Sequence, residues 1–265
     1  IRPWGPAPLR GAPCDACGPL VTRHHGHLSR RTRVGPNTRR EVEAAGPKQV
    51  VFLPARHEHW LVQTGGGYAA RVAGAIGVST DAQASWWGSE GVGTVPHALI
   101  AAYSGDTVLA TRKFAEHISP EVQVITLVDF DNDCVGTSLM VARALGKKLY
   151  GVRLDTSEML VARSVIPQMG HFRPTGVNPQ LVRNVRAALD AEGFQHVRII
   201  VSGGFDVLKI QEFERLAVPV DGYGVGSSLF GGRFDFTADV VLLEGRPVAK
   251  TGRGYRPNPR LERVR

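Results

Sequence analysis

Residues 197–228, VRIIVSGGFDVLKIQEFERLAVPVDGYGVGSS, decide the fold class. Two apolar runs, Val197–Val201 and Val220–Val225, each end in a glycine-rich turn, and an amphipathic segment opened by Asp206 lies between them. Near-continuous apolar runs are typical of strands that are covered on both faces of a parallel sheet. The stretch therefore predicts a strand, a helix and a second parallel strand, with a loop at the end of each strand.

The same alternation extends back to Gln49. Further candidate strands are Val50–Leu53, Val92–Val95, Val122–Val128 and Leu149–Leu154. Helical patterns lie between them. Ser138–Leu145 is closed by a glycine, and Asn178-Pro179 opens a helix that Gly193 ends. Strands that alternate with helices predict an α/β fold.

The position of the glycine-rich turns favours a barrel over an open sheet. In a (β/α)₈ barrel the phosphate site follows the last two strands, which is where both turns lie here. About six or seven strands can be counted, and these are too few to close a barrel. We therefore expect an incomplete, TIM-like β/α barrel over residues 49–265.

Residues 1–48 differ in composition from the rest of the chain. They contain seven prolines, and nine basic against three acidic residues, so most of the net charge of +8 lies here. Such a segment buries too little apolar surface to offset its ordering entropy, and we expect an irregular or disordered basic leader. The remaining residues are nearly neutral, which argues against nucleic acid as a partner. The chain begins at Ile1, and we treat it as a fragment or a processed form.

Several classes of protein are excluded by composition. No apolar run approaches the roughly 20 residues of a membrane span. Three cysteines are too few for a disulfide scaffold. The Cys14 and Cys17 pair lies too close to the histidines that follow it for a zinc finger.

The two glycine-rich turns are candidate phosphate sites. Glycine lets backbone N–H groups approach an anion, and the start of the following helix adds a favourable dipole. The residues predicted to contact phosphate are Ser202, Gly203, Gly204, Gly224, Gly226 and Ser227, with Ser228 as a further hydroxyl donor. The alternative is a pair of tight turns that bind nothing.

Charged residues follow other strands of the predicted sheet. Arg153 and Asp155 lie two apart, so both point to the same face, where they can hold an anion and a sugar hydroxyl or form a structural ion pair. Asp129 follows another strand and is a candidate for Mg²⁺ or a helix cap. His97 follows a third, although a lone histidine is more often structural. Arg56 belongs to a cationic cluster with two histidines, whose alternative is a solvated loop.

From about Arg56 to Arg263 the chain resembles the nicotinate phosphoribosyltransferases, which are type II phosphoribosyltransferases. The matching segments, in order, are Gly93-Thr-Val-Pro-His-Ala-Leu99, Gly151-Val-Arg-Leu-Asp-Thr156, Val201-Ser-Gly-Gly-Phe205, Tyr223-Gly-Val-Gly-Ser-Ser228, Phe234-Asp-Phe236 and Gly245-Arg-Pro-Val-Ala-Lys250. Members of the family carry a further α/β domain before the barrel, so the resemblance implies that this chain is N-terminally truncated.

The resemblance implies a specific reaction. Nicotinate attacks C1 of phosphoribosyl pyrophosphate, which gives nicotinate mononucleotide and pyrophosphate. Mg²⁺ accompanies the pyrophosphate, and ATP hydrolysis is coupled through a phosphorylated histidine, here His97. Arg56 corresponds to an arginine near pyridine and pyrophosphate, and Arg153 and Asp155 to the pair near base and ribose. A cytoplasmic homodimer, in which the partner helps to build each site, is also implied.

Three alternatives stay open. Quinolinate phosphoribosyltransferase shares the barrel but has no phosphorylated histidine, and a nicotinamide-specific relative differs only in how it treats one substituent. From a different class, the chain could be an inactive phosphate-binding protein whose basic leader contacts nucleic acid.

Overall fold

The computed structural model describes residues 31–259, apart from residues 55–56, 58, 93–94 and 233–238. The chain divides into two compact units. One spans residues 31–232 and the other combines residues 1–30 with residues 233–265, of which 239–259 are described. Each unit is considered by itself. The unit that holds the predicted barrel thus spans residues 31–232 and not the expected 49–265.

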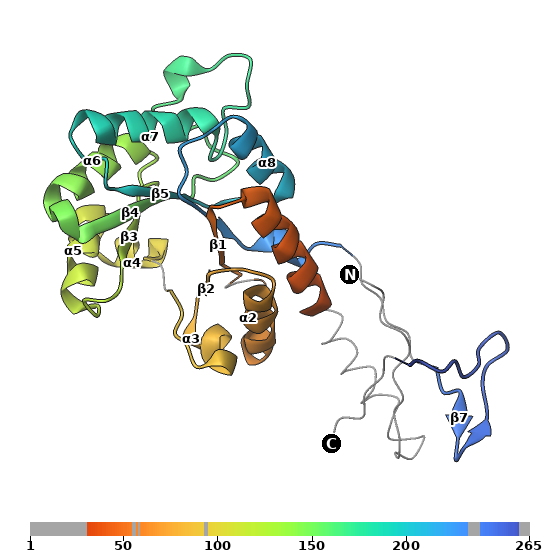
Figure 1. Ribbon diagram of the computed structural model, residues 1–265. Coiled ribbons are helices and arrows are strands. Elements are labelled where there is room, and N and C mark those ends of the chain that lie inside the picture. Colours follow the sequence, from red (N-terminus) through yellow and green to blue (C-terminus); the bar gives the residue numbers. More distant parts are fainter. Residues whose placement is uncertain (1–30, 55–56, 58, 93–94, 233–238, 260–265) are drawn as a thin grey trace. The chain divides into compact units, whose positions relative to one another are not determined.

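The larger unit is built on one parallel sheet (Figure 1). Its strands are β1 (Gln49–Phe52), β2 (Gly77–Val78), β3 (Val124–Leu127), β4 (Leu149–Leu154), β5 (Arg198–Val201) and β6 (Gly222–Val225). Their order is β2-β1-β6-β5-β4-β3, so the first strand pairs with the last. Pairing between the first strands and the last strand of a sheet is the arrangement found in a barrel. No ladder joins β2 to β3 among the described residues, and the expected incomplete barrel is confirmed.

Five of the six predicted strands are present, with ends that differ by a few residues. The exception is Val92–Val95, whose described residues Val92 and Val95 lie outside any strand. The structure instead has β2 at Gly77–Val78, a strand of only two residues. The carbonyl of Val78 accepts a hydrogen bond from the amide of Val92 (2.8 Å), so the segment that we expected to be a strand lies beside β2. So short a strand has no periodic pattern, and for this reason the sequence does not reveal it.

Helices cover the outside of the sheet (Figure 1). They are α2 (Gln63–Val72), α3 (Asp81–Ala84), α4 (His97–Ala102), α5 (Thr107–His117), α6 (Cys134–Leu145), α7 (Pro179–Ala191) and α8 (Val207–Arg215). Short 3₁₀ segments are η1 (Trp60–Val62), η2 (Ser85–Trp87), η3 (Gly146–Lys148), η4 (Ile166–Gln168) and η5 (Ser227–Phe230). The predicted caps are confirmed, since the side chains of Asn178 and Asp206 accept the third amide of α7 and α8.

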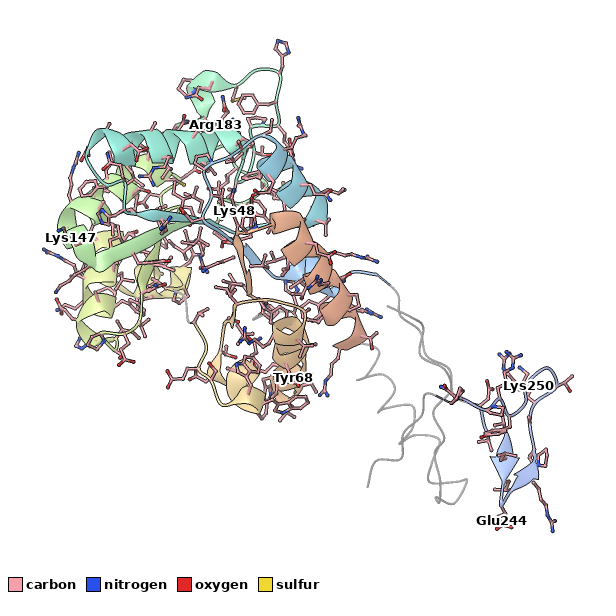
Figure 2. All side chains as sticks on the ribbon, viewed as in Figure 1. Lys48, Tyr68, Lys147, Arg183, Glu244 and Lys250 are labelled. Atoms are coloured by element: carbon pink, nitrogen blue, oxygen red, sulfur yellow. The ribbon has the colours of Figure 1, made fainter. Side chains whose placement is uncertain are left out.

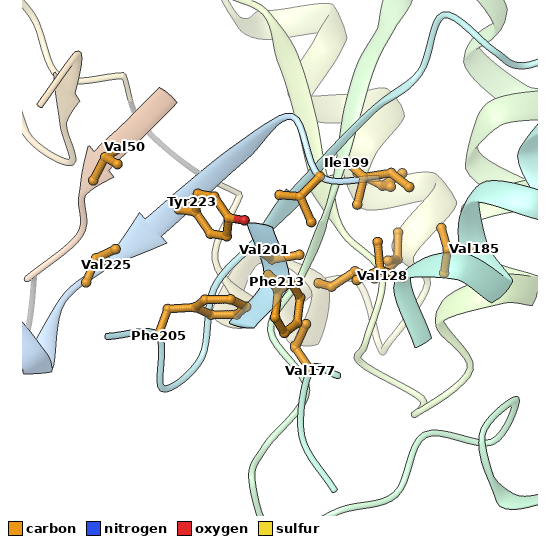
Figure 3. Packing of buried hydrophobic residues seen from close by; sticks show 14 of the residues in the cluster. Val50, Val128, Val177, Val185, Ile199, Val201, Phe205, Phe213, Tyr223 and Val225 are labelled. Carbon is orange, nitrogen blue, oxygen red and sulfur yellow. The ribbon is translucent and has the colours of Figure 1, made fainter. Parts of the chain in front are cut away.

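The core lies between the sheet and these helices (Figure 3). Ile199 and Tyr223 from neighbouring strands and Phe213 from α8 are fully buried. The ring of Phe213 meets that of Phe205 edge to face at 4.9 Å, an arrangement that aromatic pairs prefer. Phe205 belongs to the turn after β5, so the core holds the predicted phosphate turn in place.

Residues 31–45 form a helix, where we expected an irregular leader. Val34, Thr38, Glu41 and Ala45 are buried along one face, at the spacing of successive helical turns. The expectation failed because two of these four residues are polar and because a Gly-Pro pair, which usually marks a turn, lies inside the helix. The remainder of the predicted leader, residues 1–30, lies outside the described residues.

The helix over 31–45 is held by contacts with η5 and the residue after it, and the segment that follows the helix is held by α8. Asn37 Nδ2 donates to the carbonyl oxygens of Leu229 (3.0 Å) and Gly231 (3.1 Å). Lys48, at the junction of this helix with β1 (Figure 2), forms an ion pair with Glu214 of α8 (2.8 Å). The helix therefore belongs to the barrel unit.

In the second unit the described residues contain a hairpin of β7 (Leu242–Leu243) and β8 (Arg246–Pro247). Glu244 and Gly245 both have positive φ, as a two-residue hairpin turn requires. Across the described part of the chain, no helix combines the length and the apolar character needed to cross a membrane.

Candidate active site

Several predicted residues meet at the carboxyl ends of β3, β4 and β5. A cavity of about 330 Å³ opens there. It is lined by His97, Asp129, Phe130, Asn132, Asp155, Thr156, Ser157 and Leu160. In parallel α/β sheets this edge is the usual place for a ligand, because loops from different strands converge on it.

His97 and Asp129 form a pair at this cavity. His97 is the first residue of α4, and its Nε2 lies 3.1 Å from both carboxylate oxygens of Asp129. A carboxylate only accepts hydrogen bonds, so Nε2 carries the hydrogen and the lone pair of a neutral ring is on Nδ1. The hydrogen bond to Asp129 raises the pKa of His97, although burial acts in the opposite direction.

Arg153 is a buried cation that interacts electrostatically with Asp155 and Asp129, although it does not itself line the cavity. Its side chain extends from β4, and the residue is only 8% exposed. Burial lowers the pKa of Arg153, while Asp155 and Asp129 raise it. No ion pair joins it to a carboxylate of the described residues, and Asp155 accepts a hydrogen bond from Ser202 Oγ (2.8 Å). The alternative of a structural ion pair between Arg153 and Asp155 is therefore not observed.

The turn after β5 touches this group of residues. The backbone amide of Ser202 donates to the carbonyl of Leu154 (2.8 Å), which brings the turn to the end of β4. Gly203 and Gly204 both have positive φ, which favours glycine. A side chain on Gly203 would lie 3.2 Å from Asp155 Oδ1. The turn thus presents bare backbone next to Asp155.

The glycines of the turn after β6 have a packing role. A Cβ on Gly226 would lie 2.5 Å from the carbonyl oxygen of Leu53, and one on Gly224 would lie 2.5 Å from the Leu53 side chain. Their place is thus required by the close approach of β1 to β6, with or without a ligand. Ser227 is exposed at the start of η5, whereas the hydroxyl of Ser228 donates to Glu41 (2.9 Å).

The two interpretations of Asp129 can be compared with the structure. The cap of α6 is Asp133, which accepts the amide of Gly136 (3.0 Å), so Asp129 is not a helix cap. Within the described residues no three His, Cys, Asp or Glu side chains cluster as a metal site would need. Asp129 and Asp155 could still hold a metal that arrives with substrate phosphates, as Mg²⁺ commonly does.

Arg56 lies outside the described residues, so its role stays a prediction from the sequence. Of its neighbours, His57 faces the ring of Phe230, with 6.0 Å between the ring centres. His59 Nδ1 accepts the amide of Leu61 and so caps η1.

Sequence reasoning missed Lys209. Its Nζ donates to the carbonyl of Gly203 (3.2 Å), lies 4.4 Å from the ring centre of Phe205, and is 3.9 Å from Glu158. Burial lowers the pKa of Lys209. A signal was available, because position 209 is the third residue of the helix that follows the glycine turn. Asn132, with positive φ, and Thr156 were also missed.

No family model matches the chain. Two relatives from Mycobacterium tuberculosis H37Rv are informative. Nicotinate phosphoribosyltransferase pncB1 is 30% identical over 239 residues, which make up 86% of this chain and 48% of that protein. Nicotinate phosphoribosyltransferase pncB2 is 29% identical over 229 residues, or 81% of this chain and 43% of that protein. The chain thus spans about half the length of these relatives.

Two of the solved structures that resemble the chain are informative. The nicotinate-nucleotide pyrophosphorylase of Pyrococcus furiosus is 37% identical with a TM-score of 0.71, and the match covers 89% of this chain and 56% of that one. Human nicotinic acid phosphoribosyltransferase is 19% identical with a TM-score of 0.52, over 78% of this chain and 49% of that one. The second likeness concerns the fold alone.

Proposed function

This chain belongs to the nicotinate phosphoribosyltransferase family and spans about half the length of the relatives it matches, and we propose that it carries the phosphoribosyl-transfer site of such an enzyme. The reaction would join nicotinate to C1 of phosphoribosyl pyrophosphate and release pyrophosphate, as in NAD salvage. The homology and the residues around the 330 Å³ cavity support this proposal.

The observation that carries the proposal is the buried Arg153. Burial of this guanidinium is costly, because the charges of Asp155 and Asp129 offset only part of the water that it has lost and no carboxylate of the described residues pairs with it directly. Such a cation suits an anionic ligand, and its planar donors match a carboxylate or a phosphate. Nicotinate and pyrophosphate both supply such groups.

This reaction depends on groups that hold the reactants and the leaving anion in place more than on a nucleophilic side chain. As the bond from C1 to pyrophosphate breaks, positive charge develops on the ribose, and the enzyme gains rate by holding both reactants and the leaving anion in place. In our proposal Arg153 holds an anionic group and Asp155, oriented by Ser202, accepts a ribose hydroxyl. The turns at Gly203 and Gly226 would receive the 5′-phosphate.

His97 would couple the reaction to ATP. Its Nε2 hydrogen is bound to Asp129, so Nδ1 is the nitrogen that can attack the γ-phosphate of ATP. The new N–P bond forms as the bond from phosphorus to the ADP oxygen breaks. The Asp129 carboxylate would stabilise the positive charge that the ring gains in this step.

Mg²⁺ would be held by Asp129 or Asp155 together with substrate oxygens. When bound, it neutralises the charge that develops on the leaving pyrophosphate. We also propose a homodimer, as the family resemblance implies.

The first experiment is product formation from phosphoribosyl pyrophosphate, Mg²⁺ and ATP, with nicotinate, nicotinamide or quinolinate offered separately. His97→Ala is measured alongside His117→Ala, which changes an exposed histidine at the end of α5. We expect nicotinate to be used, with ATP stimulation lost in His97→Ala and kept in His117→Ala.

Other outcomes would revise the proposal. Use of quinolinate or nicotinamide would keep the fold and change the substrate. ATP stimulation that survives in His97→Ala would remove the histidine from the coupling. If none of the three bases reacts, the chain has no such activity by itself and the inactive, phosphate-binding alternative stands.

A further inference from the structure

Glu41 is a buried acid that the proposed chemistry does not use. It lies on the helix over 31–45 and is 1% exposed. One carboxyl oxygen, Oε1, accepts a hydrogen bond from Ser228 Oγ (2.9 Å). The other, Oε2, has no partner among the described residues. An unpartnered buried oxygen is uncommon and calls for an explanation.

Glu41 borders a second cavity, of about 140 Å³. The cavity is lined by Asn37, Arg40, Glu41, Asp206, Val207, Leu208 and Ser228. Val207 and Leu208 begin α8, and Ser228 lies in the first turn of η5. These two helices follow the two glycine-rich turns, so the cavity lies beside the predicted 5′-phosphate site.

The charges around Glu41 favour its neutral form. Burial raises the pKa of Glu41 to about 8, Asp206 at the start of α8 acts in the same direction, and the hydrogen bond from Ser228 opposes them. Arg40, on the same helix, supplies the one cation that lines the described cavity. Asp206 has one oxygen committed to the amide of Lys209 (2.9 Å).

We propose that Glu41 is a positioning residue that directs the hydroxyl of Ser228, so that a phosphate monoester binds when Glu41 holds a proton and binds weakly when Glu41 is ionised. This inference rests on the proposed function, because the phosphate in question is the 5′-phosphate of the phosphoribosyl group. It adds a proton-controlled residue from the first described helix to a site built by β5 and β6.

The hydrogen-bond inventory explains the effect. An ionised Glu41 can only accept, so it takes the hydroxyl hydrogen of Ser228 and leaves oxygen lone pairs toward an anion. A protonated Glu41 can donate to Ser228 Oγ, and the hydroxyl hydrogen is then free to reach a phosphate oxygen. The proton also removes a negative charge from a cavity that already contains Asp206.

The test is the affinity of the whole chain for ribose 5-phosphate, measured by calorimetry between about pH 7 and about pH 9, above the second ionisation of the phosphate. Glu41→Gln keeps the shape and the donor but cannot ionise. Glu43→Gln is the matched control, because Glu43 lies on the same helix, is exposed, and pairs with Arg39. Ser228→Ala removes the hydroxyl.

For the wild type and Glu43→Gln we expect the Kd to rise about tenfold over this range, the value of one charge-assisted hydrogen bond. Glu41→Gln should bind as tightly as the wild type at pH 7 and lose nothing at pH 9. Ser228→Ala should bind weakly at both ends. A Glu41→Gln variant as pH-dependent as the wild type, or as weak as Ser228→Ala throughout, would overturn the inference.

The failure of the proposed function has a different signature. In that case neither the wild type nor any variant binds ribose 5-phosphate at any pH, and both proposals fall. Binding that is present in all four proteins without pH dependence overturns only the role of Glu41.

Discussion

At the scale of single residues, the pair of His97 and Asp129 makes a direct prediction. Asp129→Asn removes the negative acceptor that holds the Nε2 hydrogen, and the pKa of His97 should fall toward its ordinary value. The measurement is a titration of the His97 ring signals by NMR. Asp131→Asn, an exposed neighbour, should leave the titration unchanged. An unchanged His97 pKa in Asp129→Asn would show that the pair does not form.

Arg153→Lys tests whether the planar donors of arginine matter. Lysine keeps the charge but loses the paired geometry that binds a carboxylate or phosphate, and we expect the KM for nicotinate or phosphoribosyl pyrophosphate to rise roughly tenfold or more. Arg163→Lys is the matched control, since Arg163 is exposed and pairs with Asp133 at 3.1 Å. Equal kinetics in the two variants would remove Arg153 from the site.

Glu41 also makes stability depend on pH. Its pKa is about 8 in the folded chain and near 4.5 when unfolded, so between these values the folded state binds more protons. The free energy of unfolding contributed by Glu41 is therefore greatest below pH 4.5 and falls as pH rises toward 8. Glu41→Gln should flatten this decline in urea unfolding at several pH values, whereas Glu43→Gln should follow the wild type.

At the scale of elements, the sequence revealed what is periodic and missed what is short or polar. Continuous apolar runs predict the strand before Ser202 and the strand after Asp221. Strong end signals predict the helix that Asn178 caps. β2 is too short for a pattern. The helix over 31–45 buries Thr38 and Glu41, and its burial depends on partners such as Leu229 that lie far along the chain.

For the candidate site, the sequence predicts positions at strand ends and not contacts. The prediction that Arg153 and Asp155 share a face rests on the alternation of side chains along a strand, and the expected convergence of loops rests on a parallel sheet. The contact of Ser202 with Asp155 and the position of Lys209 over Phe205 depend on side-chain directions across different strands, which a single sequence does not encode locally. The packing role of Gly226 was hidden for the same reason.

Gly226 makes a prediction about the contact of β1 with β6. An alanine there would place a methyl group 2.5 Å from the Leu53 carbonyl oxygen, and we expect a loss of about 1–3 kcal/mol in urea unfolding. Gly35→Ala is the same change in the helix over 31–45, where nothing lies within 4 Å, and it should be neutral or stabilising. Equal effects of the two changes would mean that β1 does not approach β6 so closely.

At the scale of the whole molecule, the boundary of the barrel unit can be tested by deletion. Residues 31–232 form one compact unit, so removal of residues 1–30 should leave the cooperative unfolding transition of the barrel in place. Removal of residues 1–48 should lower its midpoint sharply, because Val34 and Ala45 leave the core and Lys48 no longer pairs with Glu214. Thermal unfolding followed by circular dichroism measures both. If the two deletions unfold alike, residues 31–48 are the leader that their composition predicts, and the helix contributes nothing to the fold.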